Sequence, residues 1–406
     1  MEHFFATAPR GLEALLAGEL GALGAKDAAA VPGGVAFSGD WRVCYAANLW
    51  SRLASRVLWR VGEFSYRNEA DLHEAARKVD WMRYFTVERT LRVNVSAQKS
   101  PLTSLDFATL RIKDAVCDRF RETLGSRPNV DRANPDVRVH AFLEAERGAF
   151  YLDTSGEPLF KRGWRAGAGE APLRENLAAG IVMLSGWKPE EPLLDPMCGG
   201  ATILVEAAAM ARARAPGASR RFGFEKLKQF ENAVWESVRK ESLIPRDPPR
   251  NLQIFGSDND PRVLRDARRN VAAAGVDRWV KLEQTDILDR PAPAPAGVMI
   301  ANPPYGERIG SKEELAEFYP KLGSALKKNY PGWRCHFFTA DMRLPSSCGC
   351  SRRAACRCST ARSSAACSKS PSSPAATVRI DPARARAARS SGSGRSTCRR
   401  TERPCA

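Results

Sequence analysis

Apolar residues in the first part of the chain recur at spacings that switch between those of strands and those of helices. A strand is expected near His3–Ala6 and another near Gly34–Phe37, with a helix from Gly11 between them. These short elements predict a small α/β unit over residues 1–45, whose helix buries one leucine-rich face. The leucines at helical spacing are Leu12, Leu15, Leu16, Leu20 and Leu23.

Residues 46–155 continue with mixed helices and strands. Leu91–Val95 alternates apolar and polar residues, as a half-buried strand does. Ala108–Leu124 has an apolar and a basic side and predicts an amphipathic helix, while Val137–Leu143 and Ala149–Leu152 predict a pair of strands. These elements predict a second unit of α+β type.

A polar, glycine-rich stretch over residues 156–171 predicts a linker, after which strands alternate with helices through residues 172–344. Repeating β-α units predict a parallel sheet covered on both faces, which is a doubly wound α/β domain. Ligands of such sheets bind at the carboxyl ends of the strands. The expected strands are Pro192–Asp195, Leu252–Ser257, Val280–Glu283, Val298–Ala301 and Arg334–Phe338, and the expected helices are Ala201–Ala211, Pro261–Ala274 and Lys312–Lys328.

This pattern stops abruptly after residue 344. Residues 345–406 contain no Leu, Phe, Tyr, Trp or Met, and Val378 and Ile380 are their only large aliphatic residues. Such a segment cannot bury enough apolar surface to offset its conformational entropy, so it is expected to be disordered. A shifted reading frame of a GC-rich gene is the favoured explanation of this composition, and a genuine basic RNA-binding tail is the alternative.

The bulk composition fits a globular protein of two or three domains, since the chain has 406 residues, of which 43% are hydrophobic and 27% charged. The net charge of +17 suggests a nucleic-acid partner. However, residues 345–406 hold thirteen cations against two acids and so contribute +11 of that charge. The remainder of the chain is therefore only modestly basic.

Two classes of protein are disfavoured. No apolar run approaches the roughly 20 residues that a membrane-spanning helix needs, and Glu13 and Glu19 interrupt the N-terminal helix, unlike a secretory signal. The cytoplasm is therefore the expected location. Seven of the eleven cysteines lie in residues 345–406 without the spacing of a zinc knuckle, so no bound metal is expected.

Leu193–Thr202 predicts an apolar strand that ends in Asp195 and is followed by a glycine turn that opens a helix. Glycines let a ligand approach the backbone closely, and a helix N-terminus offers free N–H groups. An ordinary strand–turn–helix corner has the same pattern, so a ligand site at this turn needs support from other parts of the chain.

Two further acids follow predicted strands. Asp258 comes where a short carboxylate can accept hydrogen bonds from both ribose hydroxyls of a nucleoside, while Asp260 before Pro261 suits a helix N-cap. Asp286 can accept from an adenine amino group while Ile287 packs on the ring. A loop carboxylate in water is the alternative for Asp286.

The most specific element is the loop Asn302–Gly306, with the sequence Asn-Pro-Pro-Tyr-Gly. Its prolines stiffen the backbone and keep Asn302 outside the helical region. The Asn302 Oδ1 and the Pro303 carbonyl can accept both hydrogens of a base amino group while Tyr305 stacks on the flipped-out base. Holding an amine toward a sulfonium methyl is catalysis by positioning, and a structural turn is the alternative. The catalytic candidates are Asn302, Pro303, Pro304 and Tyr305.

In this order, the four elements resemble the amino-methyltransferases with an Asn-Pro-Pro-Tyr loop, in particular their RNA branch with a THUMP domain. The resemblance covers roughly residues 1–344 and includes the segments Arg127–Asp131, Asn134–Arg138, Leu152–Leu159, Lys161–Arg165 and Ala171–Ala179. It implies a Rossmann-like class I methyltransferase domain over residues 172–344. A ferredoxin-like part and a THUMP RNA-binding domain would precede it.

The resemblance also implies S-adenosylmethionine as the cofactor, 23S ribosomal RNA as the partner and the exocyclic N2 of guanine as the methyl acceptor. Rival hypotheses are guanine-N2 methylation of transfer RNA and adenine-N6 methylation of DNA, although the N-terminal half argues against DNA. The implied cofactor-binding residues are Arg174, Asn176, Asp195, Met197, Gly199, Ala201, Thr202, Asp258, Asn259, Asp286, Ile287 and Asn302.

The chain departs from this family at its end. The family's sheet finishes with an antiparallel hairpin after the strand that corresponds to Arg334–Phe338, and residues 345–406 do not resemble it. A further hypothesis is therefore an RNA-binding protein that has lost catalysis through an aberrant C-terminus.

Basic residues in the N-terminal half are candidate phosphate contacts, because the THUMP regions of this family bind RNA. A solvated charged surface is the alternative for each of them. Cations of the linker are expected to bridge the RNA between the two parts. The candidates are Lys99, Lys113, Arg127 and Arg132, with Lys161, Arg162 and Arg165 in the linker.

Overall fold

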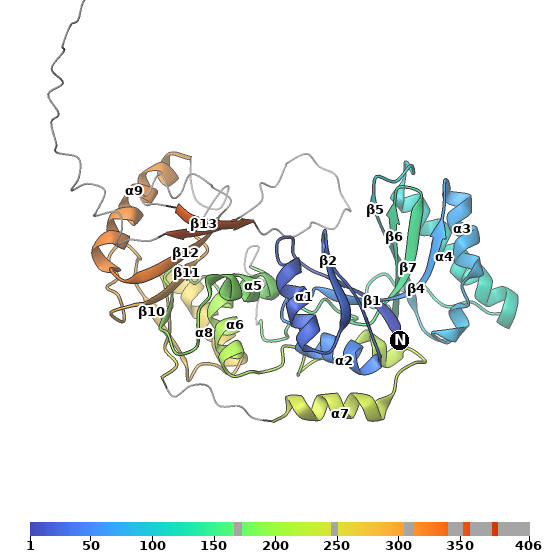
Figure 1. Ribbon diagram of the computed structural model, residues 1–406, viewed down its shortest axis with the longest axis horizontal. Helices are drawn as coiled ribbons and strands as arrows, with labels where there is room; N and C mark the ends of the chain where they lie inside the picture. Colours follow the sequence, from blue (N-terminus) through green and yellow to red (C-terminus); the bar gives the residue numbers. More distant parts are fainter. Residues whose placement is uncertain (166–172, 245–250, 304–311, 340–351, 358–375, 381–406) are drawn as a thin grey trace, which may run out of the picture.

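The structure is a computed structural model in which six ranges of the chain are described (Figure 1). Within these ranges the chain forms two sheets of seven strands each. The first sheet is built from the N-terminal part of the chain and the second from the remainder. The described ranges are residues 1–165, 173–244, 251–303, 312–339, 352–357 and 376–380.

The first five elements confirm the predicted strand–helix–strand unit and add two elements to it. Leu16 and Leu20 of α1 are buried, as the leucine stripe predicts, and β1 pairs antiparallel with β3. The strand β2 was not predicted, because its Lys-Asp-Ala-Ala-Ala-Val sequence does not alternate. The elements are β1 (Glu2–Thr7), α1 (Glu13–Ala22), β2 (Lys26–Val31), β3 (Gly34–Gly39) and α2 (Trp41–Trp50).

The strand β4 joins this unit to the next one, because it pairs with β1 along its first half and with β7 along almost its whole length. The sheet order is β2-β3-β1-β4-β7-β6-β5. The proposed boundary between residues 45 and 46 lies within α2. The elements are β4 (Arg56–Ser65), α3 (Glu69–Lys78), the 3₁₀ helix η1 (Trp81–Arg83), β5 (Leu91–Gln98), α4 (Leu105–Leu124), β6 (Val137–Glu144) and β7 (Arg147–Asp153).

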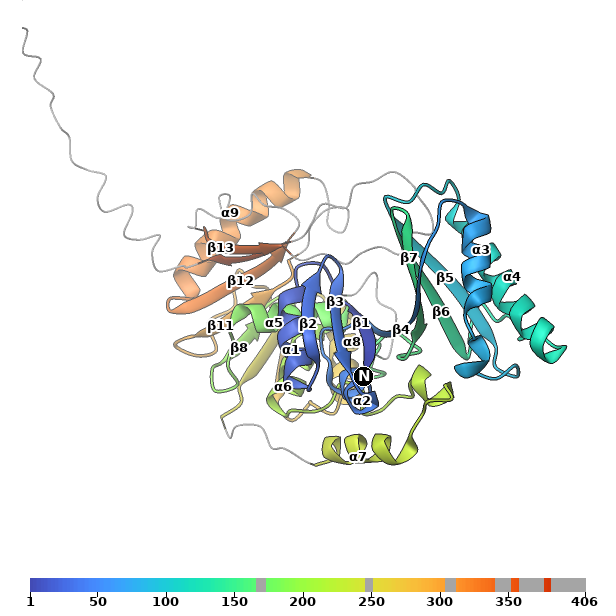
Figure 2. The ribbon, with the colours of Figure 1, turned by 45° about the vertical axis from the view of Figure 1, so that its right-hand side comes forward.

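Helices cover β5, β6 and β7 on one side. Figures 1 and 2 show α3 and α4 on the outer side of these strands, and in both views the strands lie between the helices and the rest of the molecule. In β6, the alternating residues Val137, Val139, Ala141 and Leu143 are buried, and the residues between them are partly or fully exposed. This period-two pattern is that of a sheet with one packed face.

The second sheet has the order β10-β9-β8-β11-β12-β14-β13. The strands β8 to β12 are parallel, and β14 is antiparallel to both of its neighbours. All of the strands and helices expected over residues 172–339 are confirmed. The elements are α5 (Glu175–Ser185), β8 (Leu193–Asp195), α6 (Thr202–Ala211), the 3₁₀ helix η2 (Gly223–Lys226), α7 (Asn232–Ser242), β9 (Ile254–Asp258), α8 (Pro261–Ala273), β10 (Val280–Gln284), β11 (Gly297–Ala301), α9 (Lys312–Asn329), β12 (Trp333–Thr339), β13 (Arg352–Arg357) and β14 (Ala376–Ile380).

Both faces of the central strand β11 are buried. Along β11, Val298 and Ile300 pack into one hydrophobic core, while Met299 and Ala301 pack into a second core that includes Leu322 of α9. A strand buried on both sides has a continuous apolar run instead of alternation, and β11 has this sequence pattern. In a strand of this kind, polar groups are placed after its end, as Asn302 is after β11.

The C-terminal segment corrects one expectation. Residues 345–406 were expected to be disordered throughout, yet β13 and β14 lie within them, so that expectation is wrong for residues 352–357 and 376–380. The pairing of β14 with β12 places Val378 opposite Phe337 and Ile380 opposite Cys335. These two aliphatic β-branched residues are the ones in the segment that favour a strand most strongly.

Buried charges join the two halves of the molecule. Glu206 of α6 lies 3.3 Å from Arg162 and 3.9 Å from Arg52, which follows α2. The Arg162 Nη2 donates to the Arg52 carbonyl, and the Arg52 Nη2 donates to the carbonyls of Ala209 and Arg214. Since a buried charge is costly without its partner, this network favours one arrangement of the halves.

The segment around η2 and α7 forms a second connection, because it lies against the N-terminal half. The Glu231 N–H donates to the Tyr45 hydroxyl at 2.9 Å, and the rings of Phe224 and Tyr45 lie 4.5 Å apart. The Lys226 Nζ lies 2.5 Å from Asp136. This part of the second half therefore contacts both parts of the first sheet.

Candidate functional site

Four predicted site residues meet at one edge of the second sheet. Asp195 ends β8, Asp258 ends β9, Asp286 follows β10 and Asn302 follows β11. Asp195 lies beside Gly256 in the β8–β9 register, and β11 pairs with β8 on its other side. The strand order therefore reverses beside β8, which is where ligands of open α/β sheets bind.

The turn after β8 has backbone angles that favour glycine. Gly199 has a φ of 52° and Ala201 a φ of 62°. The Gly199 N–H donates to the Asp258 Oδ2 at 3.0 Å, so the turn is held to the end of the next strand. No heavy atom of the described residues lies within 4 Å of the position of a Cβ on Gly199, so the turn leaves room for a ligand against its backbone.

Asp195 is buried, with 2% of its surface exposed. The Met197 N–H donates to its Oδ1 at 3.2 Å. The pKa of Asp195 is raised to about 8, mainly by burial and in smaller part by the nearby Asp258, although the Met197 hydrogen bond lowers it. Asp195 is therefore mostly a neutral acid near pH 7, which can donate a proton to an acceptor.

The second and third acids are accessible and retain acceptor capacity. Asp258 accepts one N–H on each oxygen, from Gly199 and Asp260. Asp286 accepts from the Leu288 N–H at 2.8 Å. Asn259 is exposed and donates to Asp286 at 3.4 Å. Since each carboxylate oxygen has two lone pairs, both acids can also accept hydrogen bonds from a ligand.

Two neighbours of these acids lie as predicted. Ile287 is buried with 3% exposure beside Asp286. Asp260 caps the N-terminus of α8 by accepting from the Arg262 N–H at 2.8 Å, with Pro261 in the first turn. The N-cap role expected for Asp260 is confirmed, so Asp258 is the acid of this pair that remains for a ligand.

Asn302 is partly exposed, but its Oδ1 is buried and has no hydrogen-bond partner among the described residues. Pro303 is buried next to it. Pro304 and Tyr305 lie outside the described residues. A buried acceptor without a partner is costly, and such costs concentrate at functional sites. Asn302 thus offers an acceptor to a donor that the described residues do not supply.

Arg165 is directed at the turn between β8 and α6. Its Nε donates to the Glu175 Oε1 at 3.0 Å, and its Nη2 donates to the Thr202 Oγ1 at 3.1 Å. Its Nη1 lies 3.8 Å from the position of a Cβ on Gly200. Burial raises the pKa of Glu175, and the Arg165 guanidinium opposes that rise. Arg165 thus connects the first turns of α5 and α6. The sequence suggested RNA binding for Arg165 and gave no sign of this connection.

The two candidates at the start of α5 differ in exposure. Arg174 is exposed and its guanidinium lies 4.9 Å from the centre of the Phe160 ring. Asn176 is fully buried, and its Nδ2 donates to the Leu53 carbonyl and the Ser55 hydroxyl of the N-terminal half. Its Oδ1 has no partner among the described residues, so Asn176 offers a second buried acceptor.

The predicted RNA contacts fall into two groups. Lys99, Arg127 and Arg132 are exposed. The other two exposed or partly exposed cations are engaged by acids, since Lys113 lies 2.6 Å from Asp114, and Lys161 lies 2.6 Å from Glu157.

Arg162 does not fit the RNA-binding prediction. It has 5% exposure, pairs with Glu206 and donates to the carbonyls of Leu159 and Arg52. The prediction that it contacts RNA phosphates is wrong, because its guanidinium is enclosed between the two halves. Nothing in the sequence indicated this burial, because Arg162 stands between Lys161 and Gly163 in a polar, glycine-rich stretch.

Comparison with known families covers most of the chain. Residues 3–58 match the RlmL ferredoxin-like domain, residues 66–153 match the THUMP domain, and residues 162–364 match the RMKL-like methyltransferase domain. The chain belongs to the RlmL-like THUMP methyltransferases. The family and the fold class expected from the sequence are confirmed. The match to a THUMP domain implies that this methyltransferase binds RNA.

Solved structures resemble this RlmL-like protein over nearly their whole length. The methyltransferase SMU.472, complexed with SAH, is 29% identical with a TM-score of 0.82, over 94% of this chain and 98% of that chain. A protein described as a predicted N6-adenine-specific DNA methylase from Listeria monocytogenes is 31% identical with a TM-score of 0.77, over 87% and 93%. TrmN from Thermus thermophilus, 21% identical, shares the fold with a TM-score of 0.65, over 94% and 99%.

The expected cofactor is confirmed, since S-adenosylmethionine is the methyl donor of this methyltransferase family. In the described part of the chain, no group of three or more His, Cys, Asp or Glu side chains is arranged to hold a metal ion. No helix among the described residues has the length and apolar character to cross a lipid bilayer.

Proposed function

We propose that this protein transfers a methyl group from S-adenosylmethionine to the exocyclic N2 of a guanine in 23S ribosomal RNA, in the cytoplasm. The observation that carries the proposal is the order of an RlmL ferredoxin-like domain, a THUMP domain and a methyltransferase domain in one chain. We assign residues 1–45 to the ferredoxin-like part, 46–155 to the THUMP domain, 156–171 to the linker and 172–344 to the methyltransferase domain.

Acids at the strand ends would hold the cofactor. Asp258 would accept from the ribose hydroxyls, and Asp286 would accept from the adenine amino group while Ile287 packs on the ring, with Asn259 beside them. The open space at Gly199 and the buried acceptor of Asn176 fit the methionine part of the cofactor. When bound, the cofactor supplies an electrophilic sulfonium methyl.

Residues around the glycine turn would position this cofactor. We add Arg165 to the site, because its guanidinium lies over Gly200 and contacts Thr202. An arginine suits the cofactor carboxylate, since its planar fork matches carboxylate geometry. The remaining proposed contacts of the turn and of the helix before it are Arg174, Asp195, Met197 and Ala201.

Asn302 would orient the acceptor base. Its buried Oδ1 and the Pro303 carbonyl would each accept one hydrogen of the guanine amino group, which directs the nitrogen lone pair away from them. We propose that Pro304 stiffens this loop and that Tyr305 stacks on the base. No side chain needs to remove a proton beforehand, because the amine becomes acidic only once the new N–C bond has formed.

Specific observations favour two rival functions. The Listeria protein is described as acting on DNA adenine, and Asn302 would accept an adenine N6 amino group equally well, whereas the THUMP domain favours RNA. The family match ends at residue 364, within the segment of aberrant composition, so an RNA-binding protein without catalysis is the other rival. Transfer RNA remains an alternative RNA substrate.

The test is methyl transfer from radiolabelled S-adenosylmethionine to 23S ribosomal RNA, transfer RNA and duplex DNA, followed by nucleoside analysis. We expect label in N2-methylguanosine from 23S ribosomal RNA. Label only in DNA or only in transfer RNA would refute the proposed substrate. Calorimetry with S-adenosylmethionine separates the non-catalytic rival, for which a folded sample would bind RNA but no cofactor.

A further inference from the structure

The strands β5, β6 and β7 carry a row of arginine, histidine, tyrosine and asparagine side chains on the face that α3 and α4 do not cover. In β6 this face holds Arg138, His140 and Phe142, which alternate with buried residues. The β5–β6 register places Arg92 beside Arg138 and Asn94 beside His140. Because paired residues in a sheet lie on the same face, these side chains form one surface.

The surface continues across β7 to β4. Tyr151 lies opposite His140 in the β6–β7 register and opposite Arg60 in the β4–β7 register. The row Arg60, Tyr151, His140 and Asn94 therefore crosses four strands. The Tyr151 ring also lies 6.4 Å from that of Phe5 in β1. Phe142 adds an aromatic side chain with 38% exposure, one of the exposed large hydrophobic residues of the described chain.

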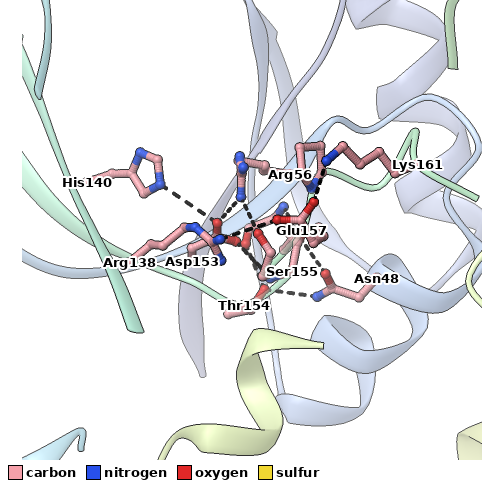
Figure 3. A network of polar contacts seen from close by, with 12 residues as sticks. Asn48, Arg56, Arg138, His140, Asp153, Thr154, Ser155, Glu157 and Lys161 are labelled. Carbon is pink, nitrogen blue, oxygen red and sulfur yellow. Dashed lines mark hydrogen bonds and ion pairs between the residues drawn. The ribbon is translucent and has the colours of Figure 1, made fainter. Parts of the chain in front are cut away.

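The cations of this face differ in how far acids neutralise them. Figure 3 shows Arg56 and His140 directed at the buried Asp153. Arg56 forms an ion pair with Asp153, and the His140 Nε2 lies 3.8 Å from the Asp153 Oδ2. Arg138 lies 3.4 Å from Glu157. This part of the face is an ordered network of paired charges, which holds the side chains in place.

Arg92 is exposed, and its Nη1 donates to the carbonyl of Arg132 at 2.7 Å. Among the described residues, neither Arg92 nor the exposed Arg132 forms an ion pair with an acid. This edge of the face thus carries two guanidiniums that no carboxylate neutralises. It also links the sheet face to a residue that the sequence predicts to contact RNA.

We propose that this open sheet face, made of Arg60, Arg92, Asn94, Arg138, His140, Phe142 and Tyr151, binds single-stranded RNA. Arg92 contacts phosphates, Phe142 and Tyr151 stack on bases, and Asn94 bonds base edges, while His140 and Arg138 stay in the ordered network. Exposed aromatic rings next to cations suit unstacked bases, whereas a duplex buries its base faces. The inference rests on the proposed RNA methyltransferase function and names the RNA-binding surface.

The face is oriented for this role. In Figures 1 and 2 it is turned toward the remainder of the molecule, while α3 and α4 occupy the side turned away from it. The network around Glu206 connects the two halves. RNA held on this face therefore lies on the side of the THUMP sheet nearer the methyltransferase half. Of the earlier candidates, Lys113 lies in α4, in the helical layer on the opposite side.

The test measures binding of the full chain to a fluorescein-labelled single-stranded RNA of about 12 nucleotides, by anisotropy over a series of salt concentrations. Phe142→Ala should weaken binding roughly tenfold, and Phe142→Tyr should restore it. Arg92→Ala should lower the slope of log K against log salt by about 0.7. The matched controls Phe107→Ala and Arg121→Ala, both on exposed positions of α4, should bind as wild type does.

Unchanged RNA affinity in both face variants overturns the proposal, as does a loss confined to the α4 controls, which would place RNA on the helical layer. If Phe142→Tyr binds RNA as weakly as Phe142→Ala does, the aromatic ring does not bind a base, and this result also contradicts the proposal. The methylation assay is read separately. Loss of RNA binding in the face variants supports this surface even if the wild type methylates another nucleic acid. If the face variants bind RNA and methylate 23S ribosomal RNA as the wild type does, the proposed surface is refuted and the proposed function is not.

Discussion

The two seven-stranded sheets present their polar side chains in different places. The THUMP part of the first sheet has helices on one side, so alternate residues such as His140 and Tyr151 lie on an open face. In the second sheet both faces of the central strand β11 are buried, and the polar groups Asp195, Asp258 and Asn302 come at strand ends. One sheet thus provides a surface and the other an edge.

This difference matches the sizes of the two ligands. An RNA strand needs an extended surface with repeated contacts, whereas one methyl group and one amine need a few atoms held in fixed positions. A sheet covered on one side can supply the former and a doubly covered parallel sheet the latter. We infer that capture and chemistry are divided between the sheets, and the following predictions test that division.

The largest effect is expected where the sheets are joined. Glu206→Ala leaves Arg52 and Arg162 buried without their carboxylate, and should lower the free energy of unfolding by about 3–5 kcal/mol. Glu236→Ala, on an exposed position of α7, should change it by less than about 1 kcal/mol. The measurement is denaturant unfolding at neutral pH. Similar losses in the two variants would show that the buried network does not hold the halves together.

The next largest effect distinguishes the role of the strand-end site in the second sheet from that of the open face of the first sheet. Asn302→Ala removes the buried acceptor and should lower kcat by about 10²–10³-fold, with little change in affinity for RNA or for S-adenosylhomocysteine. Phe142→Ala should do the reverse and weaken RNA binding with little change in kcat at saturating RNA. Single-turnover methylation and RNA titrations measure both. An Asn302→Ala enzyme with kcat within tenfold of wild type would remove Asn302 from the chemistry.

Substitution of Arg165 tests whether this end of the linker contributes to cofactor binding or to RNA binding. Arg165→Ala should remove a hydrogen bond to a charged group and so weaken the binding free energy of S-adenosylhomocysteine by about 1.5–3 kcal/mol. The affinity for RNA should not change. Lys161→Ala, an exposed linker cation, is the control that should leave cofactor binding unchanged. Calorimetry and RNA anisotropy provide the two affinities. If Arg165→Ala weakens RNA binding alone, the linker interpretation made from the sequence is right for this residue.

The smallest effect concerns the titration of Asp195. Its pKa is raised from 3.8 to about 8 in the folded protein, so the folded state binds a proton more tightly than the unfolded state. The free energy of unfolding therefore falls as the pH rises between these values. From about pH 6.5 to 7.5 the Asp195 contribution is at most about 1.4 kcal/mol. Asp195→Asn should lack this decline in urea unfolding, and an identical decline in the variant would contradict the raised pKa.

The sequence predicted the elements with strong local patterns. The leucine stripe of α1, the alternation in β6 and the apolar runs before Asp195 and Asn302 all correspond to elements of the structure. The strand β2, which it missed, lacks such a period. In the C-terminal segment, β14 formed where two β-branched residues alternate in an otherwise unfavourable composition.

By itself, the sequence determined the strongly patterned elements, the family and the acids and amide that follow the parallel strands, because these depend on spacing over a few residues. Only the tertiary structure decided that Arg162 is buried, that Arg165 reaches the turn after β8 and that Phe142 lies on an open face. Exposure and partners depend on segments distant in the chain, such as Glu206 for Arg162, and no local pattern encodes that pairing.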